Sequence, residues 1–250
     1  MVQTVRRLRA IYHNLKFRLR FRAFRDAEQL FTHYYTVNRW GNKESVSGAG
    51  STLEYTENIR RGIPRLTERL GVKTILDAPC GDYNWFRHIP RAKGPTYVGG
   101  DIVEPLVRRN QEVFGDATTC FRQLDVIRDE LPAAELWLCR DCLFHLSNAD
   151  VFLTIANFLR SDVRYWLTST HPECEQNMDI PTGSFRLLNL ELPPFGFCKP
   201  QVTLDDWIEG FPARLLGIWE REELSQALAN NAAVQVAVRD LLRKSARVSS

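Results

Sequence analysis

The segment R-D-C-L-F-H, which spans Arg140 to His145, places a carboxylate and an imidazole four residues apart. If the segment turns helical, both side chains lie on one face of it. Because histidine titrates near neutral pH, we expect His145 to act as a general base, with Asp141 orienting it or the substrate. His171, in the segment LTSTHP, is a second candidate for a base or a substrate contact. The structural alternatives are that His145 packs beside the following helix and that His171 belongs to a turn before Pro172.

The same region contains a C-x-x-C-x-x-H pattern, which is typical of part of a zinc site. It consists of Cys139, Cys142 and His145. A structural zinc site normally needs four ligands, and no second pair with ligand spacing stands nearby in the sequence. Cys139 also belongs to an apolar run that is typical of a strand. We therefore expect no metal site here.

A second candidate site is LDAPCGDYNWF, residues 76–86, where an apolar run ends in a tight turn. Loops that bind dinucleotides have the pattern G-x-G-x-x-G, because the pyrophosphate must approach backbone amides at a helix N-terminus. Here a single glycine, Gly81, stands between Asp77 and Asp82. Acidic side chains repel pyrophosphate but suit a cation. The turn therefore favours the sulfonium and α-amino groups of S-adenosylmethionine over NAD.

Two further acids stand where such a fold would bind the rest of a nucleoside. Asp101 ends an expected strand 20 residues after Gly81, where an acid accepts hydrogen bonds from ribose hydroxyls. Asp125 ends the next expected strand, from which it or its neighbours could reach an adenine edge. Neither acid identifies the cofactor alone, since NAD enzymes also carry the first one.

Strand and helix patterns alternate from residue 72 onward. A buried strand is expected at 72–78, further strands at 96–101, 119–125, 135–140 and 163–170, and helices at 82–89, 104–114 and 148–160. This alternation predicts an α/β fold, a doubly wound parallel sheet with helices on both faces. Ligands of such sheets bind beyond the carboxyl ends of the strands, so the candidate residues should converge there. The tail is expected to form an edge strand at 214–221 and a closing helix at 222–244.

LDAPCGDYNWF, followed by YVGGDIV, LDV and LWLCRDCLFHLS, resembles the first four motifs of the class I S-adenosylmethionine-dependent methyltransferases. The segments W-G-N-x-E-S-x-S-G-x-G-S before it and N-x-D-I-x-T-G-x-x-R-x-L-N-L after it look like those of a bacterial subgroup. The match covers about residues 38–220. The resemblance implies a Rossmann-like methyltransferase sheet and S-adenosyl-L-methionine as cofactor. One departure is that Pro79 and Tyr83 replace the glycines that usually flank Gly81.

The resemblance also implies a set of cofactor contacts. The turn after the first strand would line the methionine end, Asp101 would bind the ribose, and Asp125 with Val126 would flank the adenine. Arg140 would close the floor with its backbone, and Trp85 stands close enough for a contact. The expected cofactor-binding residues are Asp77, Ala78, Pro79, Gly81, Asp82, Trp85, Asp101, Ile102, Asp125, Val126 and Arg140.

The segment 177–195 is too polar at its start and too rich in proline at its end for a core element. We expect it to supply an acceptor pocket with groups that match hydroxyls, phosphates or carboxylates. Arg186 in particular would suit a phosphorylated or acidic acceptor. An ordinary surface loop is the alternative. The expected substrate residues are Asn177, Asp179, Thr182, Arg186 and Asn189.

The net charge of +3 is distributed unevenly along the 250 residues. Residues 1–25 contain eight basic and no acidic side chains, so the rest of the chain carries −5. Apolar residues in this arm recur at helical spacing, which predicts a basic amphipathic helix over 1–30. It could pack on the body or a second subunit, lie on a membrane surface, or contact RNA. The acidic body argues against general nucleic-acid binding.

No apolar run approaches the roughly 18 residues of a membrane span, and the six cysteines, mostly isolated among apolar residues, suggest a reducing compartment. We expect a cytoplasmic protein, with peripheral membrane contact through residues 1–25 as an option. Its expected organisation is the 1–30 helix, a helical lead-in over 31–70 with a lid loop at 38–51, and a methyltransferase domain over 71–250.

The expected activity is methylation of a hydroxyl or similar group on a sugar, glycan precursor or small polar metabolite. One alternative keeps the cofactor but makes the acceptor a protein or RNA. A second is a non-catalytic cofactor-binding protein of the same fold. An oxidoreductase that uses NAD or a nucleotide sugar is disfavoured by the acidic turn.

Overall fold

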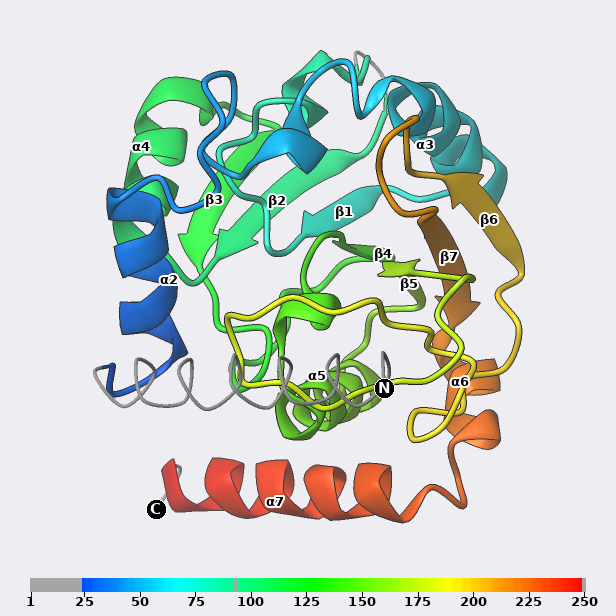
Figure 1. Ribbon diagram of the computed structural model, residues 1–250. Helices are drawn as coiled ribbons and strands as arrows, with labels where there is room; N and C mark the ends of the chain where they lie inside the picture. Colours follow the sequence, from blue (N-terminus) through cyan, green and yellow to red (C-terminus); the bar gives the residue numbers. More distant parts are fainter. Residues whose placement is uncertain (1–23, 92–93, 249–250) are drawn as a thin grey trace, which may run out of the picture.

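The computed structural model describes residues 24–91 and 94–248. Its centre is a seven-stranded sheet with strand order β3-β2-β1-β4-β5-β7-β6 (Figure 1). Strands β1 to β5 run parallel, whereas β7 runs antiparallel to both of its neighbours. The strands are β1 Thr74–Asp77, β2 Thr96–Asp101, β3 Thr119–Gln123, β4 Leu136–Cys139, β5 Tyr165–Thr170, β6 Val202–Asp205 and β7 Leu215–Glu220.

Helices cover both faces of this sheet. Neighbouring residues of β1 point to opposite sides: Ile75 belongs to a buried apolar cluster that includes residues of α3 and α4, and Leu76 to one that includes residues of α5 and α6. Helix α7 packs against the outer side of α5 through Ala237 and Leu241 (Figure 1). The α-helices are α2 Ala27–Thr36, α3 Glu57–Leu70, α4 Glu104–Phe114, α5 Asn148–Arg160, α6 Arg221–Ala227 and α7 Ala232–Val248, and short 3₁₀ helices span Ala49–Ser51, Phe86–His88 and Leu143–His145.

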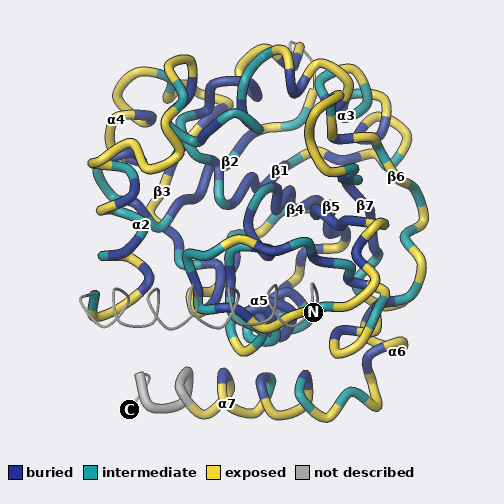
Figure 2. Tube along the Cα trace, in the orientation of Figure 1, coloured by how far each residue is buried: buried dark blue, intermediate teal, exposed yellow. Residues whose placement is uncertain are grey.

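The core lies around the middle strands. Every residue of β4 is buried, and so is every residue of β5. Trp137 on β4 and Trp166 on β5 stack face to face, with ring centroids 4.9 Å apart and an interplanar angle of 4°. Figure 2 shows these strands as buried along their length, while α7 alternates between buried and exposed residues. The doubly wound sheet expected from the alternating pattern is confirmed.

Two of the expected helices, 104–114 and 148–160, are confirmed at the same bounds. The helix expected at 82–89 is wrong, because only Phe86–His88 forms a turn of 3₁₀ helix. Tyr83 has a positive φ of 59°, which is incompatible with helix. Asp82, just before it, hydrogen-bonds to residues 45–47, so its turn is fixed by a distant segment.

The tail also differs from expectation. The strand at 214–221 forms as β7, but it is not an edge strand, since β6 pairs with its outer side. The single helix expected at 222–244 is divided into α6 and α7. Asn231 explains the break: its Oδ1 accepts hydrogen bonds from the amides of Ala233 and Val234 at 3.1 and 3.3 Å. Its Nδ2 donates to the carbonyl of Phe195 at 3.0 Å.

At the N-terminal side, most of the helix expected at 1–30 lies outside the described residues. The described part begins with α2, where the carboxylate of the N-cap Asp26 accepts a hydrogen bond from the Gln29 amide at 2.9 Å. The segment 38–51 follows and leads into α3. Of the helices within 24–91 and 94–248, none combines the length and apolar character needed to cross a membrane.

Candidate active site

A cavity of about 410 Å³ opens at the carboxyl edge of the sheet. Residues at or just after the ends of β1, β2, β3 and β4 line it, and Asp77, Asp101, Asp125 and Arg140 are among them. Its size falls in the range of roughly 300–1,000 Å³ that is typical of small-molecule sites. Doubly wound sheets bind their ligands at this edge, so the cavity is where the fold rule places a site.

Nine of the eleven residues expected to bind a cofactor line this cavity. Of the two exceptions, Ala78 is buried beneath the turn, and its carbonyl accepts a hydrogen bond from the indole N–H of Trp137 at 2.8 Å. Asp82 faces the segment 42–51 instead. The nine lining residues are Asp77, Pro79, Gly81, Trp85, Asp101, Ile102, Asp125, Val126 and Arg140.

Asp77 is a buried carboxylate at the cavity wall. Its Oδ2 accepts a hydrogen bond from the Tyr97 hydroxyl at 2.7 Å. Burial raises the pKa of Asp77 to about 7, although the Tyr97 hydrogen bond and the charge of Arg140 oppose the rise. A carboxylate that is costly to ionise in this position would be stabilised by a cationic ligand in the cavity.

Asp101 and Gly81 join the ends of β1 and β2. The Gly81 amide donates to Asp101 Oδ2 and the Val103 amide to Oδ1, each at 3.0 Å. Burial nevertheless raises the pKa of Asp101. Each carboxylate oxygen has a second acceptor site, and the residue lines the cavity. Asp101 therefore keeps capacity to accept a hydrogen bond from a ligand hydroxyl.

Asp125 and Val126 follow β3. The carboxylate of Asp125 accepts hydrogen bonds from the Ile127 amide at 2.9 Å and from Arg128 at 2.8 Å. The Val126 carbonyl accepts one from Asn157 Nδ2 at 2.8 Å. Within residues 24–91 and 94–248, no hydrogen bond of the Val126 amide is found. This amide can donate to a ring nitrogen, which the Asp125 carboxylate, an acceptor already paired, cannot do.

Asp82 fastens the segment 42–51 to the turn after β1. Its carboxylate accepts hydrogen bonds from the Ser45 hydroxyl at 3.0 Å and the Val46 amide at 2.9 Å, and its amide donates to Ser47 Oγ at 3.2 Å. A Cβ at Gly81, where φ is +55°, would lie 2.2 Å from that same oxygen. Gly81 is thus needed for the close approach of this segment, and Asp82 braces it rather than lining the cavity.

Arg140 and Asp206 form the first half of a buried charge network at one wall. Arg140 donates to the two carboxylate oxygens of Asp206 at 2.9 and 2.8 Å, and to the Gly50 carbonyl at 2.6 Å. Asp206 is fully buried. The neighbouring carboxylates raise the pKa of Arg140. The side chain of Arg140 therefore fixes this wall of the cavity, whereas the expected contact of its backbone with a cofactor stays a prediction.

Arg214 and Asp141 complete this network. Arg214 ion-pairs with Asp206 at 2.9 Å and donates to Asp141, which also accepts from Arg140 at 3.2 Å. The two guanidinium groups lower the pKa of Asp141 against the effect of burial. Arg214 precedes β7, whose first residue Leu215 pairs with the last residue of β5. Because β7 is antiparallel, the residue just before it, Arg214, lies at the edge where the parallel strands end.

His145 lines the cavity, and one of its two ring nitrogens is hydrogen-bonded within the protein. Its Nδ1 lies 2.7 Å from the Ser184 carbonyl, and because a carbonyl can only accept, Nδ1 carries the proton. Nε2 is then the basic nitrogen. Burial lowers the pKa of His145, so the ring is neutral at pH 7. Asp141 does not orient it as expected: the segment after Asp141, whose φ is +55°, forms only a short 3₁₀ turn, and the Ser184 carbonyl takes that role.

His171 does not reach the cavity. It is buried, its Nδ1 accepts a hydrogen bond from the Leu188 amide at 3.3 Å, and its ring packs edge-on against Phe144 at 5.1 Å. Burial and the nearby charge of Arg214 lower the pKa of His171 to about 4. His171 therefore has the structural role that was the alternative to a general base.

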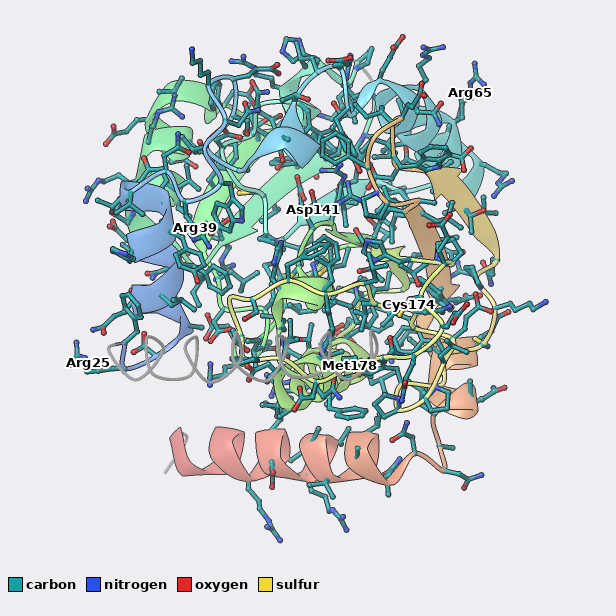
Figure 3. All side chains as sticks on the ribbon, in the orientation of Figure 1. Arg25, Arg39, Arg65, Asp141, Cys174 and Met178 are labelled. Atoms are coloured by element: carbon teal, nitrogen blue, oxygen red, sulfur yellow. The ribbon has the colours of Figure 1, made fainter. Side chains whose placement is uncertain are left out.

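The five residues expected to form an acceptor pocket form hydrogen bonds within the fold and are absent from the cavity lining. Arg186 is buried and donates to the Leu146 carbonyl at 2.9 Å and the Met178 carbonyl at 2.6 Å. Asn177 donates to the Asn189 carbonyl at 2.8 Å. In Figure 3, Met178 lies over α5, apart from Asp141 at the centre of the view. None of the set lines the cavity: Asn177, Asp179, Thr182, Arg186 and Asn189.

The remaining two of these residues fix the start of α5. Thr182 Oγ1 accepts a hydrogen bond from the Ser147 amide at 2.9 Å, and Asp179 accepts one from the Asn148 amide at 2.8 Å. Amides in the first turn of a helix need such partners. The polar residues of 177–189 therefore satisfy backbone groups of their own fold, which corrects the prediction that they bind the acceptor.

Aromatic side chains form much of the remaining lining. They come from α2, the segment 38–51, the loop before α3, the turn after β4 and the loops at 185 and 211. Among all described residues, no group of three or more His, Cys, Asp or Glu side chains is placed to hold a metal ion. The aromatic lining residues, apart from Trp85, are Phe31, Tyr35, Trp40, Tyr55, Phe144, Phe185 and Phe211.

The sequence matches no known family model, and no curated protein is similar enough to count as a match. Solved structures are similar in fold. For 1,6-didemethyltoxoflavin-N1-methyltransferase from Burkholderia thailandensis the TM-score is 0.55 and the identity 17%, over 77% of this chain and 86% of that chain. For magnesium protoporphyrin IX methyltransferase from Synechocystis PCC 6803 with bound SAM, the TM-score is 0.51 and the identity 17%, over 78% and 98%.

A third similar structure is the PH0226 protein from Pyrococcus horikoshii OT3, with a TM-score of 0.51 and 15% identity over 74% of this chain and 98% of that chain. At these identities the comparisons establish the fold alone. The chain has the Rossmann-like class I methyltransferase fold, with the strand order given above.

Proposed function

We propose that the protein is an S-adenosylmethionine-dependent methyltransferase that methylates a hydroxyl or similar group of a small acceptor. The observation that carries the proposal is one cavity lined together by Asp77, Asp101, Val126 and His145. Within the fold established above, this combination offers a place for a cation, a ribose, an adenine edge and an acceptor proton.

The residues present fit this cofactor. Asp77 would face its cationic end, because the carboxylate is buried and its pKa is raised in the absence of a cation. Asp101 would accept from the ribose hydroxyls, and the Val126 amide would donate to adenine. Asp82, bound to residues 45–47, would hold the segment 42–51 beside the turn. An acidic turn of this kind disfavours NAD and its pyrophosphate.

Bound here, the cofactor would supply an electrophilic methyl group. The protein's part is to position the acceptor and to remove its proton. Nε2 of His145 is suited to accept that proton, since Nδ1–H is held by the Ser184 carbonyl. The lowered pKa keeps the ring neutral and ready to accept at pH 7.

Asp141 would position the acceptor; it would not orient His145. Its side chain is 23% exposed, and Arg140 and Arg214 hold it in place from two sides. A carboxylate anchored in this way can accept a hydrogen bond from the acceptor without rotating. The roles given to Asp141 and His145 are part of the proposal.

The residues that line the cavity, and not Arg186, indicate the class of acceptor. The expectation of a sugar or glycan acceptor relied in part on Arg186 and its neighbours, and these lie elsewhere. Two proteins of similar fold are methyltransferases of non-macromolecular compounds, 1,6-didemethyltoxoflavin and magnesium protoporphyrin IX. This similarity supports a small-molecule acceptor over a protein or RNA.

We also propose a cytoplasmic protein, whose 1–25 arm contacts a membrane surface or a subunit.

The test is methyl transfer from S-adenosylmethionine with a labelled methyl group into fractionated cell extract. The wild-type protein is expected to label one small-molecule fraction, and His145→Ala to label it at least 100-fold less, in line with the roughly 10²–10⁴-fold contribution of a general base. His88→Ala, which removes an exposed histidine away from the cavity, serves as the matched control. Full labelling by His145→Ala would refute the base assignment, and labelling of no fraction by the wild type would refute the activity.

A further inference from the structure

We propose that the acceptor is an uncharged, flat aromatic compound whose reacting hydroxyl is attached to the ring, and not a phosphorylated sugar or a nucleotide sugar. This inference rests on the proposed methyltransferase function and names the substrate class of the same cavity. Three features carry it: an aromatic rim, aromatic contacts around His145, and the pairing of every lining cation.

The rim of the cavity carries three exposed aromatic rings. Trp40, Phe185 and Phe211 are 38%, 57% and 43% exposed, and all three line the cavity. They come from three separate segments: the loop after α2, the segment before β6, and the β6–β7 loop. Large apolar rings that converge on one opening mark a binding site for apolar surface. A flat ring can pack against them.

The same kind of surface surrounds the expected base. The ring centroids of Phe185 and Trp40 lie 5.9 and 6.3 Å from that of His145, and the ring of Phe144 lies at 4.7 Å. Tyr55 meets Phe211 edge-on at 5.1 Å, and both rings also line the cavity. A group that presents a proton to His145 therefore enters between aromatic rings, where an aromatic body gains edge and face contacts.

The charges in the cavity disfavour an anionic acceptor. In the described chain, Arg140 and Arg214 are the cations that line it, and both are ion-paired with Asp141 and Asp206. Arg214 Nη2 has no hydrogen-bond partner, but it is buried and offers no surface to a phosphate. The other lining charges are carboxylates. A phosphate or diphosphate would find no cation that is free to pair with it.

The base also suits an acidic hydroxyl. The hydroxyl of a phenol, as in tyrosine, has a pKa of about 10, far below that of a sugar hydroxyl. Burial lowers the pKa of His145, which makes it a weaker base than an exposed histidine. Proton transfer to such a base is easiest from a hydroxyl whose own acidity is high.

The experiment measures binding to the full-length protein loaded with S-adenosylhomocysteine. Loading is first verified by calorimetry, so a protein that fails to bind it refutes the proposed function and not the acceptor class. The loaded protein is then titrated with catechol, 2-naphthol and 7-hydroxycoumarin, and with D-glucose, glucose 6-phosphate and UDP-glucose. We expect at least one phenol to bind at micromolar to low millimolar concentration, and each of the three sugars to bind at least tenfold more weakly or not at all.

Two variants test whether the aromatic rim is responsible. Phe185→Ala and Phe211→Ala are each expected to weaken phenol binding by about fivefold to tenfold, the size of a lost aromatic contact, with unchanged affinity for S-adenosylhomocysteine. The control is Trp207→Ala, which removes an aromatic ring that is 42% exposed but does not line the cavity. It should change neither affinity.

Three results would overturn the inference while leaving the proposed function intact. The first is a loaded protein that binds none of the phenols. The second is tighter binding of glucose 6-phosphate or UDP-glucose than of any phenol. The third is phenol binding that Trp207→Ala weakens as much as Phe185→Ala and Phe211→Ala do.

Discussion

Asp77→Asn should make folding stability less sensitive to pH. The carboxylate is 2% exposed, and its pKa in the folded protein is raised from 3.8 to about 7 by burial. The substitution removes the ionisable group but keeps an oxygen that can accept the hydrogen bond now donated by Tyr97. It therefore isolates the cost of ionising a carboxylate at this position.

The sign and size follow from the two pKa values. Between pH 3.8 and 7 the folded protein holds a proton on Asp77 that the unfolded chain has lost, so raising the pH favours unfolding. Three units of pKa correspond to about 4 kcal/mol, or roughly 1.4 kcal/mol per pH unit within that window. Relative to the wild type, Asp77→Asn should gain about 4 kcal/mol in unfolding free energy between pH 4 and pH 8.

The assay is urea denaturation of both proteins at pH 4, 5, 6, 7 and 8, without cofactor. Asp162→Asn, which neutralises an exposed carboxylate, is the matched control and should track the wild type. A difference between Asp77→Asn and the wild type that stays constant over this range would refute the reasoning. So would a difference that shrinks as the pH rises, because a carboxylate stabilised by its surroundings behaves that way.

Other perturbations give equally specific outcomes. Asp82→Ala should weaken S-adenosylmethionine binding about tenfold and speed proteolysis within 42–51, because it removes the contacts to Ser45 and Val46. An unchanged rate of proteolysis in this segment would contradict the bracing role of Asp82. Arg186→Met should lower the unfolding free energy by about 3 kcal/mol, since three backbone or side-chain oxygens lose their donor. The KM for the acceptor should not change. A raised KM would mean that Arg186 contacts the acceptor, as first expected from the sequence. The acid limb of the kcat profile should lie below pH 6.5, because burial lowers the pKa of His145; a limb above pH 7 would argue for another base.

The parallel half of the fold could be predicted from the sequence because its signals are local. Buried runs such as 72–78 and 163–170 alternate with helical patterns, and this order alone implies parallel strands. The carboxyl ends of parallel strands meet at one edge. Residues such as Asp77, Asp101 and Arg140, which stand at the ends of different strands, could therefore be assigned to one cavity from the sequence.

Arg214 and Asp206 could not be found in the same way. Their place at the site depends on β7 running antiparallel, with Leu215 opposite Thr170. The short strand β6, Val202–Asp205, alternates only between partly buried and exposed residues and gives little sequence signal. An arginine just before an antiparallel strand that follows a parallel sheet is the one pattern that could have indicated it.

The polar residues of 177–189 show why residue type alone misassigns a role. Arginine, asparagine and threonine are the groups that bind a polar ligand, but they are also the groups that satisfy backbone carbonyls and helix N-termini. Arg186 does the latter for Leu146 and Met178. Only the position of the partners distinguishes the two roles, and that position comes from tertiary structure.

The central claim is that the cavity binds S-adenosylmethionine through acidic residues at the strand ends. The most direct measurement is isothermal titration calorimetry of the full-length protein with S-adenosylmethionine and, separately, with NAD, for the wild type and Asp101→Ala. We expect one micromolar site for S-adenosylmethionine in the wild type, its loss in Asp101→Ala, and no heat with NAD. Binding of NAD without binding of S-adenosylmethionine would contradict this claim.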